Sequence, residues 1–288
     1  MEASETLSPV VQRRRLRTEL RRARLDAGLT QEQVAAAMDW SLSKLIRIEN
    51  GSVGISTNDL KAILAHYKIT DEGRNVEFLG LARGARERSW WSTYREASPG
   101  LIQLIEYESA ASIIRNFQPM LIPGLLQTEE YATTMIRNFR PAATAQEVKT
   151  GVEIRMRLQQ ILQQAEMPLM FFIMDEAAVR RLVGGQDAMR RQIQRLIDES
   201  AKPAVTIEVV PFSAGAHPGM QNSFMLFEFP DAEDDDALYL EGVSDSRFNR
   251  DDPEEISGFR ERFEVLRDLS LGPQGSADFL RRLMNELT

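Results

Sequence analysis

The chain has no cysteine and only two histidines among its 288 residues. The lack of cysteine excludes disulfides, thiol catalysis and cysteine-based zinc sites, and two histidines leave little for any other zinc site. No apolar run approaches the roughly 20 residues that a membrane-spanning helix needs. The N-terminus also lacks the basic and apolar regions of a secretion signal. We therefore expect a cytoplasmic protein, not bound to a membrane, that holds no metal and no other cofactor.

Motifs for catalysis are scarce as well. No glycine-rich phosphate loop is present, since Gly184-Gly185 alone indicates a turn. Neither His66 nor His217 is accompanied by a G-x-S-x-G motif, so a Ser-His-Asp arrangement is not indicated. The acidic run 231–236 lacks the central glycine and distal glutamate of an EF-hand loop, and is typical of a solvated hairpin tip. These absences predict that the chain is not an enzyme.

The formal net charge of −8 disfavours nucleic-acid binding at first, but the charge is unevenly distributed. Residues 13–47 contain nine basic and four acidic residues, a local net charge of +5, which leaves −13 for the rest of the chain. This asymmetry is typical of a basic DNA-binding head on an acidic body. A basic helix that is merely solvated is the alternative interpretation.

Residues 30–51, TQEQVAAAMDWSLSKLIRIENG, have the pattern of two short helices joined by a tight turn. Thr30 and Gln33 are spaced as a capping box at the start of the first helix. Ser41 is the expected cap of the second helix, which Asn50-Gly51 would end. In a helix-turn-helix, the second of two such helices lies in the major groove of DNA. Two neighbouring helices of an ordinary bundle would give a similar pattern.

At these residues the chain resembles the Xre/Cro-type repressors, whose pattern runs from T-Q-x-x-[VL]-A to E-N-G. The matching residues are Thr30-Gln31, Val34-Ala35 and Glu49-Asn50-Gly51. The resemblance implies an all-α, lambda-repressor-like N-terminal domain that binds double-stranded DNA. Because one recognition helix makes few base contacts, we expect a homodimer on a pseudo-palindromic operator, associated with the nucleoid when bound.

The resemblance also implies roles for single residues. Arg24 and Glu49 would form a buried structural ion pair between the first helix and the recognition helix. Arg47 would supply the strongest base contact, most naturally with guanine. The expected base contacts are Leu42, Ser43 and Arg47, and the expected contacts to the DNA backbone are Gln31, Ser41, Lys44, Arg13 and Arg14.

The remainder of the chain predicts an α+β domain with a small sheet covered by helices. We expect strands near 112–117, 168–174, 205–210, 224–229 and 237–241, and helices near 125–138, 145–164, 176–183, 186–200, 253–269 and 277–287. The predicted boundaries are a flexible arm (1–12), the helix-turn-helix domain (13–84), a linker (85–100) and the C-terminal domain (101–288). Trp90 and Trp91 would cover the joint between the domains or form a dimer contact.

A second resemblance rests on Gln118-Pro119, Pro123–Thr128, Tyr131-Ala132 and Val210-Pro211-Phe212 with the Gly-x-His-Pro-Gly that follows. These residues are similar to the C-terminal domain of WhiJ-like or antitoxin-like Xre regulators of filamentous actinobacteria. The resemblance implies a regulatory domain of unknown function that docks a small partner protein encoded nearby. The alternative is a one-component regulator that binds a small-molecule effector in a pocket lined by Phe212 and His217. An enzyme fused to a DNA-binding head is a third, weaker hypothesis.

Overall fold

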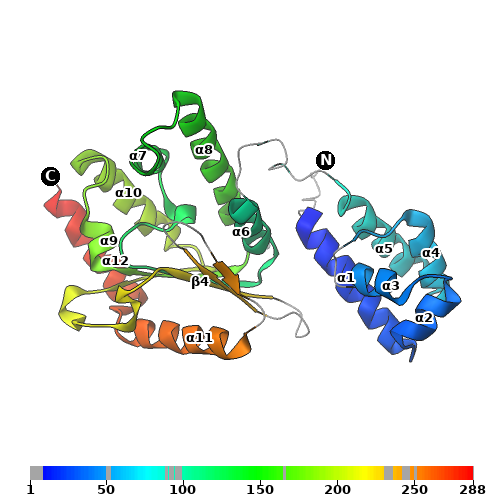
Figure 1. Cartoon of the computed structure of the whole chain (residues 1–288). Coiled ribbons are helices and arrows are strands. Elements are labelled where there is room, and N and C mark those ends of the chain that lie inside the picture. Colours follow the sequence, from blue (N-terminus) through cyan, green and yellow to red (C-terminus); the bar gives the residue numbers. More distant parts are fainter. Residues whose placement is uncertain are drawn as a thin grey trace. The chain divides into compact units, whose positions relative to one another are not determined.

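A computed structural model describes residues 9–49, 53–87, 90, 94, 99–164, 167–229, 236–241, 247–249 and 252–287. The chain divides into two compact units, Met1–Glu96 and Ala97–Thr288, each described here by itself (Figure 1). No helix in these described ranges combines the length and the apolar character needed to cross a membrane.

The described part of the N-terminal unit is helical, with α1 (Pro9–Asp26), α2 (Gln31–Ala37), α3 (Leu42–Glu49), α4 (Thr57–His66) and α5 (Glu72–Gly84). Side-chain caps determine where four of these helices begin, because Thr30, Ser41, Ser56 and Asp71 each accept the backbone N–H of the residue three positions on. Thr30 and Gln33 form a complete capping box. One core joins all five helices, with Leu20, Val34, Leu45, Leu60 and Phe78 among its members.

Helix α1 begins earlier than the sequence predicts. Residues 9–12, which were expected to belong to the flexible arm, are part of α1. Gln12 is buried against the end of α5, where a Cβ added to Gly84 would lie 1.7 Å from Gln12 Oε1. The first turn of α1 therefore packs closely against the end of α5, and a side chain at position 84 would have to displace the end of the Gln12 side chain.

The C-terminal unit is built on one mixed six-stranded sheet with the order β3-β2-β1-β4-β5-β6. The strands β1 (Ile113–Gln118), β2 (Leu169–Asp175) and β3 (Val205–Val210) are parallel, whereas β4 (Phe224–Glu228), β5 (Ala237–Leu240) and β6 (Arg247–Asn249) continue it antiparallel. Parallel neighbours need long crossovers. Helices α7 (Glu129–Phe139) and α8 (Ala145–Leu158) connect β1 to β2, and α9 (Glu176–Arg180) and α10 (Gln186–Glu199) connect β2 to β3.

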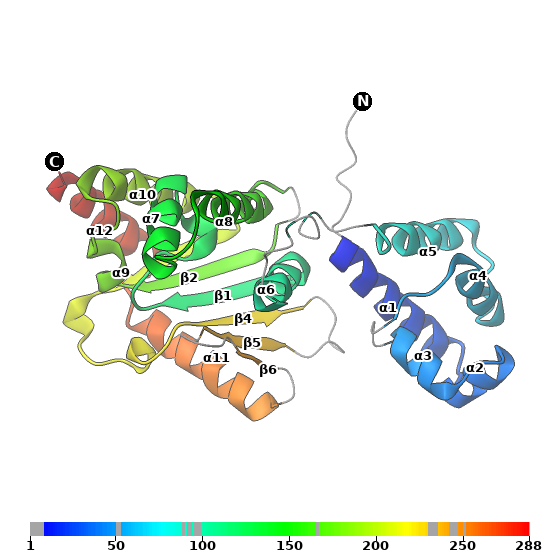
Figure 2. The same ribbon diagram turned by 45° about the horizontal axis from the view of Figure 1, so that its top comes forward.

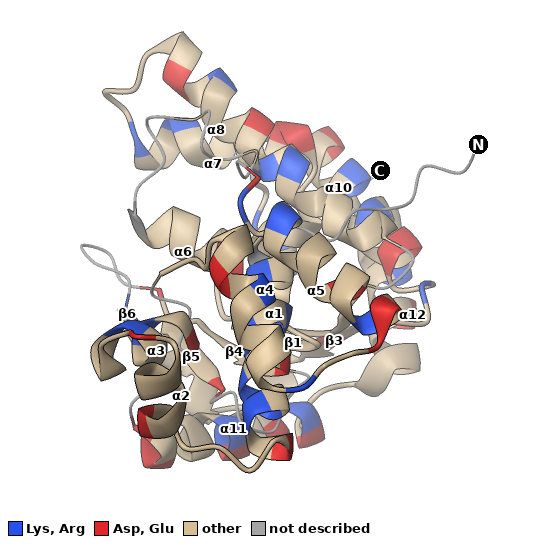
Figure 3. Cartoon of the chain, turned by 90° about the vertical axis from the view of Figure 1, so that its right-hand side faces the viewer, with Lys and Arg blue, Asp and Glu red and all other residues tan. Residues whose placement is uncertain are grey.

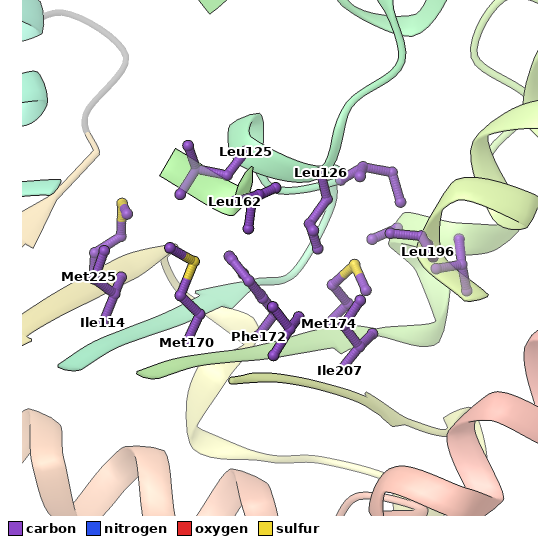
Figure 4. Close-up of a cluster of buried hydrophobic side chains, with 14 of the residues drawn as sticks. Ile114, Leu125, Leu126, Leu162, Met170, Phe172, Met174, Leu196, Ile207 and Met225 are labelled. Atoms are coloured by element: carbon purple, nitrogen blue, oxygen red, sulfur yellow. The ribbon is translucent and has the colours of Figure 1, made fainter. Parts of the chain in front are cut away.

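Helices cover both faces of this sheet (Figure 2). Helices α7 to α10 and α12 (Gly272–Glu286) lie on one face, and α11 (Pro253–Asp268) lies on the other. Side chains along β2 alternate between the two faces and so supply both cores. Met170, Phe172 and Met174 point toward the first face, where Leu162 and Leu196 pack (Figure 4). The fold class predicted from the sequence is therefore confirmed: an all-α unit precedes an α+β unit.

The second core lies under α11. Phe117 and Ile173 of the sheet pack there with Phe263 of the helix, and all three side chains are buried. Arg115 of β1 points to the same face and pairs with Glu228 at 2.7 Å and with Glu264 of α11 at 3.2 Å. This ion pairing joins the helix to the strand beside the apolar contacts.

The outer edge of β3 is closed by the start of α12. Val209 donates its N–H to Ser276 Oγ at 2.9 Å, and the Val209 carbonyl accepts the N–H of Leu271 at 2.9 Å. Ser276 is fully buried. An edge strand whose backbone groups are paired in this way cannot recruit a foreign strand at those positions.

Several predicted boundaries are wrong. Helix α6 (Pro99–Ala110) and strand β6 were not predicted, and α12 begins at Gly272 rather than near residue 277. Helices α6 and α12 have proline and glycine near their first residue. In a sequence this pair suggests that helical structure is interrupted, but proline is well tolerated in the first turn of a helix. Helix α7 starts after the cap Thr128, not at residue 125, because residues 124–126 form a separate 3-10 turn.

Some predictions fall on parts of the chain that the structure does not describe. Trp90 is described, and its ring meets Tyr94 edge to face with the ring centroids 5.9 Å apart. The predictions that lie outside the described residues concern positions 1–8 of the arm, the helix stop Asn50-Gly51, Trp91 and residues 231–235 of the acidic run.

Glu108 of α6 is an acidic side chain in the interior of the C-terminal unit. The residue is only 6% exposed, and its Oε2 has no hydrogen-bond partner among the described residues. Burial raises the pKa of this carboxyl from 4.5 to about 7, although the positive charge of Arg155 acts in the opposite direction. The folded state therefore binds this proton more tightly than the unfolded state does.

The raised pKa predicts how stability depends on pH. The contribution of Glu108 is present in full below the unfolded pKa of about 4.5 and is lost as the pH rises through 7, so wild-type protein should lose about 2 kcal/mol between pH 5 and pH 8 through this group. Glu108→Gln is neutral at every pH and should remove that loss. Urea denaturation of both proteins at the two pH values measures it. A stability difference between them that does not change with pH would contradict the assignment.

Candidate nucleic-acid interface

The turn between α2 and α3 is closed by backbone hydrogen bonds and one side-chain cap. Trp40 donates its N–H to the Ala35 carbonyl at 2.8 Å, and Asp39 has a φ of 54°, in the left-handed region that aspartate tolerates better than most residues. Ser41 Oγ accepts the N–H of Lys44 at 3.2 Å. This bond caps α3 and sets the angle at which the helix leaves the turn.

Helix α3 has one buried and one exposed face. Leu45 and Ile48 are 0% and 4% exposed and pack into the core of the unit. Four side chains at positions i, i+1, i+4 and i+5 form the opposite face, which we call the recognition stripe. The recognition stripe consists of Leu42, Ser43, Ile46 and Arg47, all of which are exposed.

Ile46 was missed by the sequence interpretation. It lies one turn after Leu42 and next to Arg47, so helical spacing alone places it on the recognition stripe. Isoleucine in a short amphipathic helix usually belongs to the core, so an exposed position was not expected for Ile46. The structure leaves 39% of Ile46 exposed, close to the 37% of Leu42.

An ion pair holds the end of α3 against α1. The guanidinium of Arg24 donates to both carboxylate oxygens of Glu49, from Nε to Oε1 at 2.8 Å and from Nη2 to Oε2 at 3.0 Å. The two side chains are 8% and 4% exposed. Arg24 also donates to the Leu29 carbonyl at 2.9 Å, so one side chain joins α1, the turn before α2 and α3.

Gln31 extends this network to the first residue of α2. Its Nε2 donates to Glu49 Oε2 at 2.8 Å. An amide nitrogen has two N–H donors, so one remains for a phosphate. Nearby, burial raises the pKa of the Tyr67 hydroxyl, and the charge of Glu49 acts in the same direction. The hydrogen bond from Gln31 to Glu49 connects the start of α2 to the end of α3.

Lys44 lies beside the recognition stripe but already has partners. Its Nζ is 3.2 Å from Asp59 Oδ2 of α4 and 3.9 Å from the centroid of the Trp40 ring. The side chain is 41% exposed, so the pair is worth little in solvent. A phosphate would have to compete with Asp59 for this cation.

Arg13 and Arg14 are far along α1 from the recognition stripe. Arg13 Nη2 donates to the Ala85 carbonyl at 3.3 Å, at the C-terminal end of α5. The separation between Arg13 and Arg24 corresponds to roughly 16 Å along the helix axis. Arg14 is the next residue along α1, so the same separation applies to it. Arg21 and Arg22 are exposed and closer in the chain to Arg24, on the basic helix α1 (Figure 3).

The structure places the two expected pocket residues of the C-terminal unit in opposite environments. Phe212 is 58% exposed, whereas the His217 side chain is 3% exposed and its Nε2 lies 2.9 Å from Asp175 Oδ2. Asp175 also caps α9 by accepting the N–H of Ala177 at 2.7 Å. No described contact joins Phe212 to His217. In the described parts of the chain, no cluster of three or more histidine, aspartate and glutamate side chains is arranged to hold a metal ion.

Comparison with known protein families gives two matches. Residues 15–76 match a family described as "Helix-turn-helix domain", and this range contains the recognition stripe and the Arg24–Glu49 pair. Residues 101–282, more than half of the chain, match a family described as "Domain of unknown function (DUF5753)". No curated protein and no solved structure matches the chain.

We predict that breaking the Arg24–Glu49 pair causes a large loss of stability. Arg24→Met leaves the Glu49 carboxylate buried without its cation and should lower the free energy of unfolding by about 3 to 5 kcal/mol. The double variant Arg24→Met/Glu49→Met removes both charges and should recover most of this loss. Urea denaturation measures both.

The matched control is Arg22→Met, since Arg22 is an exposed arginine on the same helix. It should change the free energy of unfolding by less than about 0.5 kcal/mol. If Arg24→Met is no more destabilising than Arg22→Met, the pair does not hold α3 in place.

Proposed function

Because the chain belongs to the family with the domain of unknown function DUF5753 and has a helix-turn-helix domain, we propose that it is a sequence-specific transcription regulator. The helix-turn-helix match supports a DNA-binding regulator. The observation that carries the proposal is the recognition stripe, whose four exposed side chains lie on a helix held at its end by a buried ion pair. Such a helix can enter the major groove as a rigid element.

The recognition stripe offers one guanidinium, one hydroxyl and two aliphatic side chains for reading bases. These groups contact only a few base pairs, which is too little for selective binding by one copy. We infer a homodimer on a pseudo-palindromic operator, so that two recognition helices read two half-sites. In this proposal the backbone contacts come from Gln31, Ser41 and Lys44, with Arg13 and Arg14 further along α1.

For the C-terminal unit we propose regulation by a small partner protein, as the resemblance to WhiJ-like or antitoxin-like regulators implies. The resemblance is what supports this role, and the large exposed apolar side chains of the unit are candidates for contacts with such a partner. Phe139, Phe212 and Met220 are 68%, 58% and 64% exposed. We infer no catalytic role for the unit, because the sequence has no G-x-S-x-G motif to supply a nucleophile beside the His217–Asp175 pair.

A small-molecule effector is the second candidate, and one observation favours it. Glu108 Oε2 and Asn116 Oδ1 are buried and have no hydrogen-bond partner among the described residues. Buried polar atoms of this kind are uncommon in native structures, and a polar ligand would satisfy them. Phe212 and His217 receive no comparable support, because their side chains lie in different environments.

Co-purification separates these two roles. We predict that full-length protein isolated from its native cells retains a small protein in a fixed ratio, and that mass spectrometry identifies it. A retained metabolite with no protein would contradict the partner proposal and favour the effector. The control is Glu108→Gln, which should retain the partner protein but should lose a ligand that bonds to the carboxyl.

Binding titrations test the DNA proposal. An operator is first selected from random double-stranded DNA with full-length protein. Arg47→Ala should weaken operator binding by about 1 to 3 kcal/mol and relax the sequence preference, because arginine reads guanine edges. Gln31→Ala should weaken all sequences by a similar factor, as expected of a phosphate contact.

Arg282→Ala serves as the matched control, because Arg282 is an exposed arginine of the C-terminal unit. It should leave operator affinity unchanged. Unchanged specific binding by Arg47→Ala would show that the recognition face is assigned wrongly. Full-length protein with no salt-dependent affinity for DNA would overturn the proposed function itself.

A further inference from the structure

Two of the four side chains of the recognition stripe are aliphatic. Leu42 and Ile46 are 37% and 39% exposed, and they are neighbours one helical turn apart on the same face. Leucine and isoleucine in a helix of eight residues would be expected to serve the core. Here Leu45 and Ile48 already do so, at 0% and 4% exposed.

Contacts with neighbouring side chains also do not explain why Leu42 and Ile46 are aliphatic. Lys44, between Leu42 and Ile46 in the sequence, contacts Asp59 and the Trp40 ring instead of the aliphatic pair. The remaining members of the recognition stripe, Ser43 and Arg47, are polar and exposed. The aliphatic surface is therefore presented outward together with one cation and one hydroxyl.

The major groove offers an apolar group to such a surface. Among the base edges there, the C5-methyl of thymine is the largest apolar group, and most of the other groups are hydrogen-bond donors and acceptors. Residues four apart on a helix are separated by roughly 6 Å along its axis. Successive bases on one strand are about 3.4 Å apart. Two aliphatic side chains at this spacing can meet methyl groups that are one or two base pairs apart.

We propose that Leu42 and Ile46 determine specificity by contacting two thymine methyl groups in each half-site, beside the base read by Arg47. This inference rests on the proposed function and adds to it a chemical class of base contact and a residue, Ile46, that the resemblance did not assign. The operator half-site then contains two A·T pairs, one or two steps apart, whose thymines are recognised through their methyl groups.

The test changes the DNA rather than the protein. Each thymine of the selected operator is replaced singly by uracil, which lacks the C5-methyl and keeps the same hydrogen bonds. Full-length wild-type protein should bind about four-fold more weakly when either of two thymines per half-site is replaced, the effect of one buried methyl group. The other replacements should have no effect. Uracil that is neutral at every position would overturn the proposal.

Protein variants assign the two methyl groups. Ile46→Ala should abolish the uracil effect at one of the two positions, and Leu42→Ala should abolish it at the other. The matched control is Val76→Ala, since Val76 is an aliphatic side chain on α5 that is 65% exposed. This control should retain both effects. Uracil effects that persist in full in both Ile46→Ala and Leu42→Ala would assign methyl reading to other residues and overturn the proposal.

The same experiment separates this inference from the proposed function. If selection yields no operator, the proposed function and the inference fail together. If an operator is selected and its binding depends on salt and on Arg47, but no uracil replacement weakens it, only the inference fails. The uracil replacements use wild-type protein, so their result does not depend on how well the variants fold.

Discussion

The ion pair between Arg24 and Glu49 is the interaction on which the N-terminal unit depends. Two charges that are less than one tenth exposed are costly to bury, and their mutual hydrogen bonds, with those to the Leu29 carbonyl and from Gln31, offset that cost. The pair lies at the end of α3, and Gln31 connects it to the start of α2. With the cap at Ser41, both ends of α3 are held. A helix held at both ends can present four outward side chains in one geometry, which is what base reading requires.

The C-terminal unit follows a different constraint. A mixed sheet with helices on both faces must fill two cores, and β2 supplies both through the alternation of its side chains. Among the buried polar side chains of this unit, Glu108 and Asn116 each keep an oxygen without a hydrogen-bond partner among the described residues, whereas His217 is paired with Asp175. Buried polar atoms without a partner are uncommon in native structures, and a bound partner or ligand would satisfy them. That property fits the regulatory role proposed for it.

Local signals predicted much of the fold. The capping box at Thr30, the apolar spacing of Leu45 and Ile48 and the apolar run of β2 each act over a few residues, so they can be identified in one sequence. Interactions between distant residues were not predictable in this way. The Arg24–Glu49 pair was expected only from a family resemblance. Ile46, by contrast, was missed although helical spacing alone places it on the recognition stripe. Helix α6 was missed because Pro99-Gly100 suggests a break while it in fact begins a helix.

The central claim is that α3 reads the major groove, and methylation interference tests it most directly. Dimethyl sulfate methylates guanine at N7 in the major groove and adenine at N3 in the minor groove. The account predicts that guanine N7 methylation within each operator half-site blocks binding of full-length protein, because Arg47 approaches that edge. Adenine methylation in the minor groove should have no effect at those positions. Interference by minor-groove methylation alone would contradict the account.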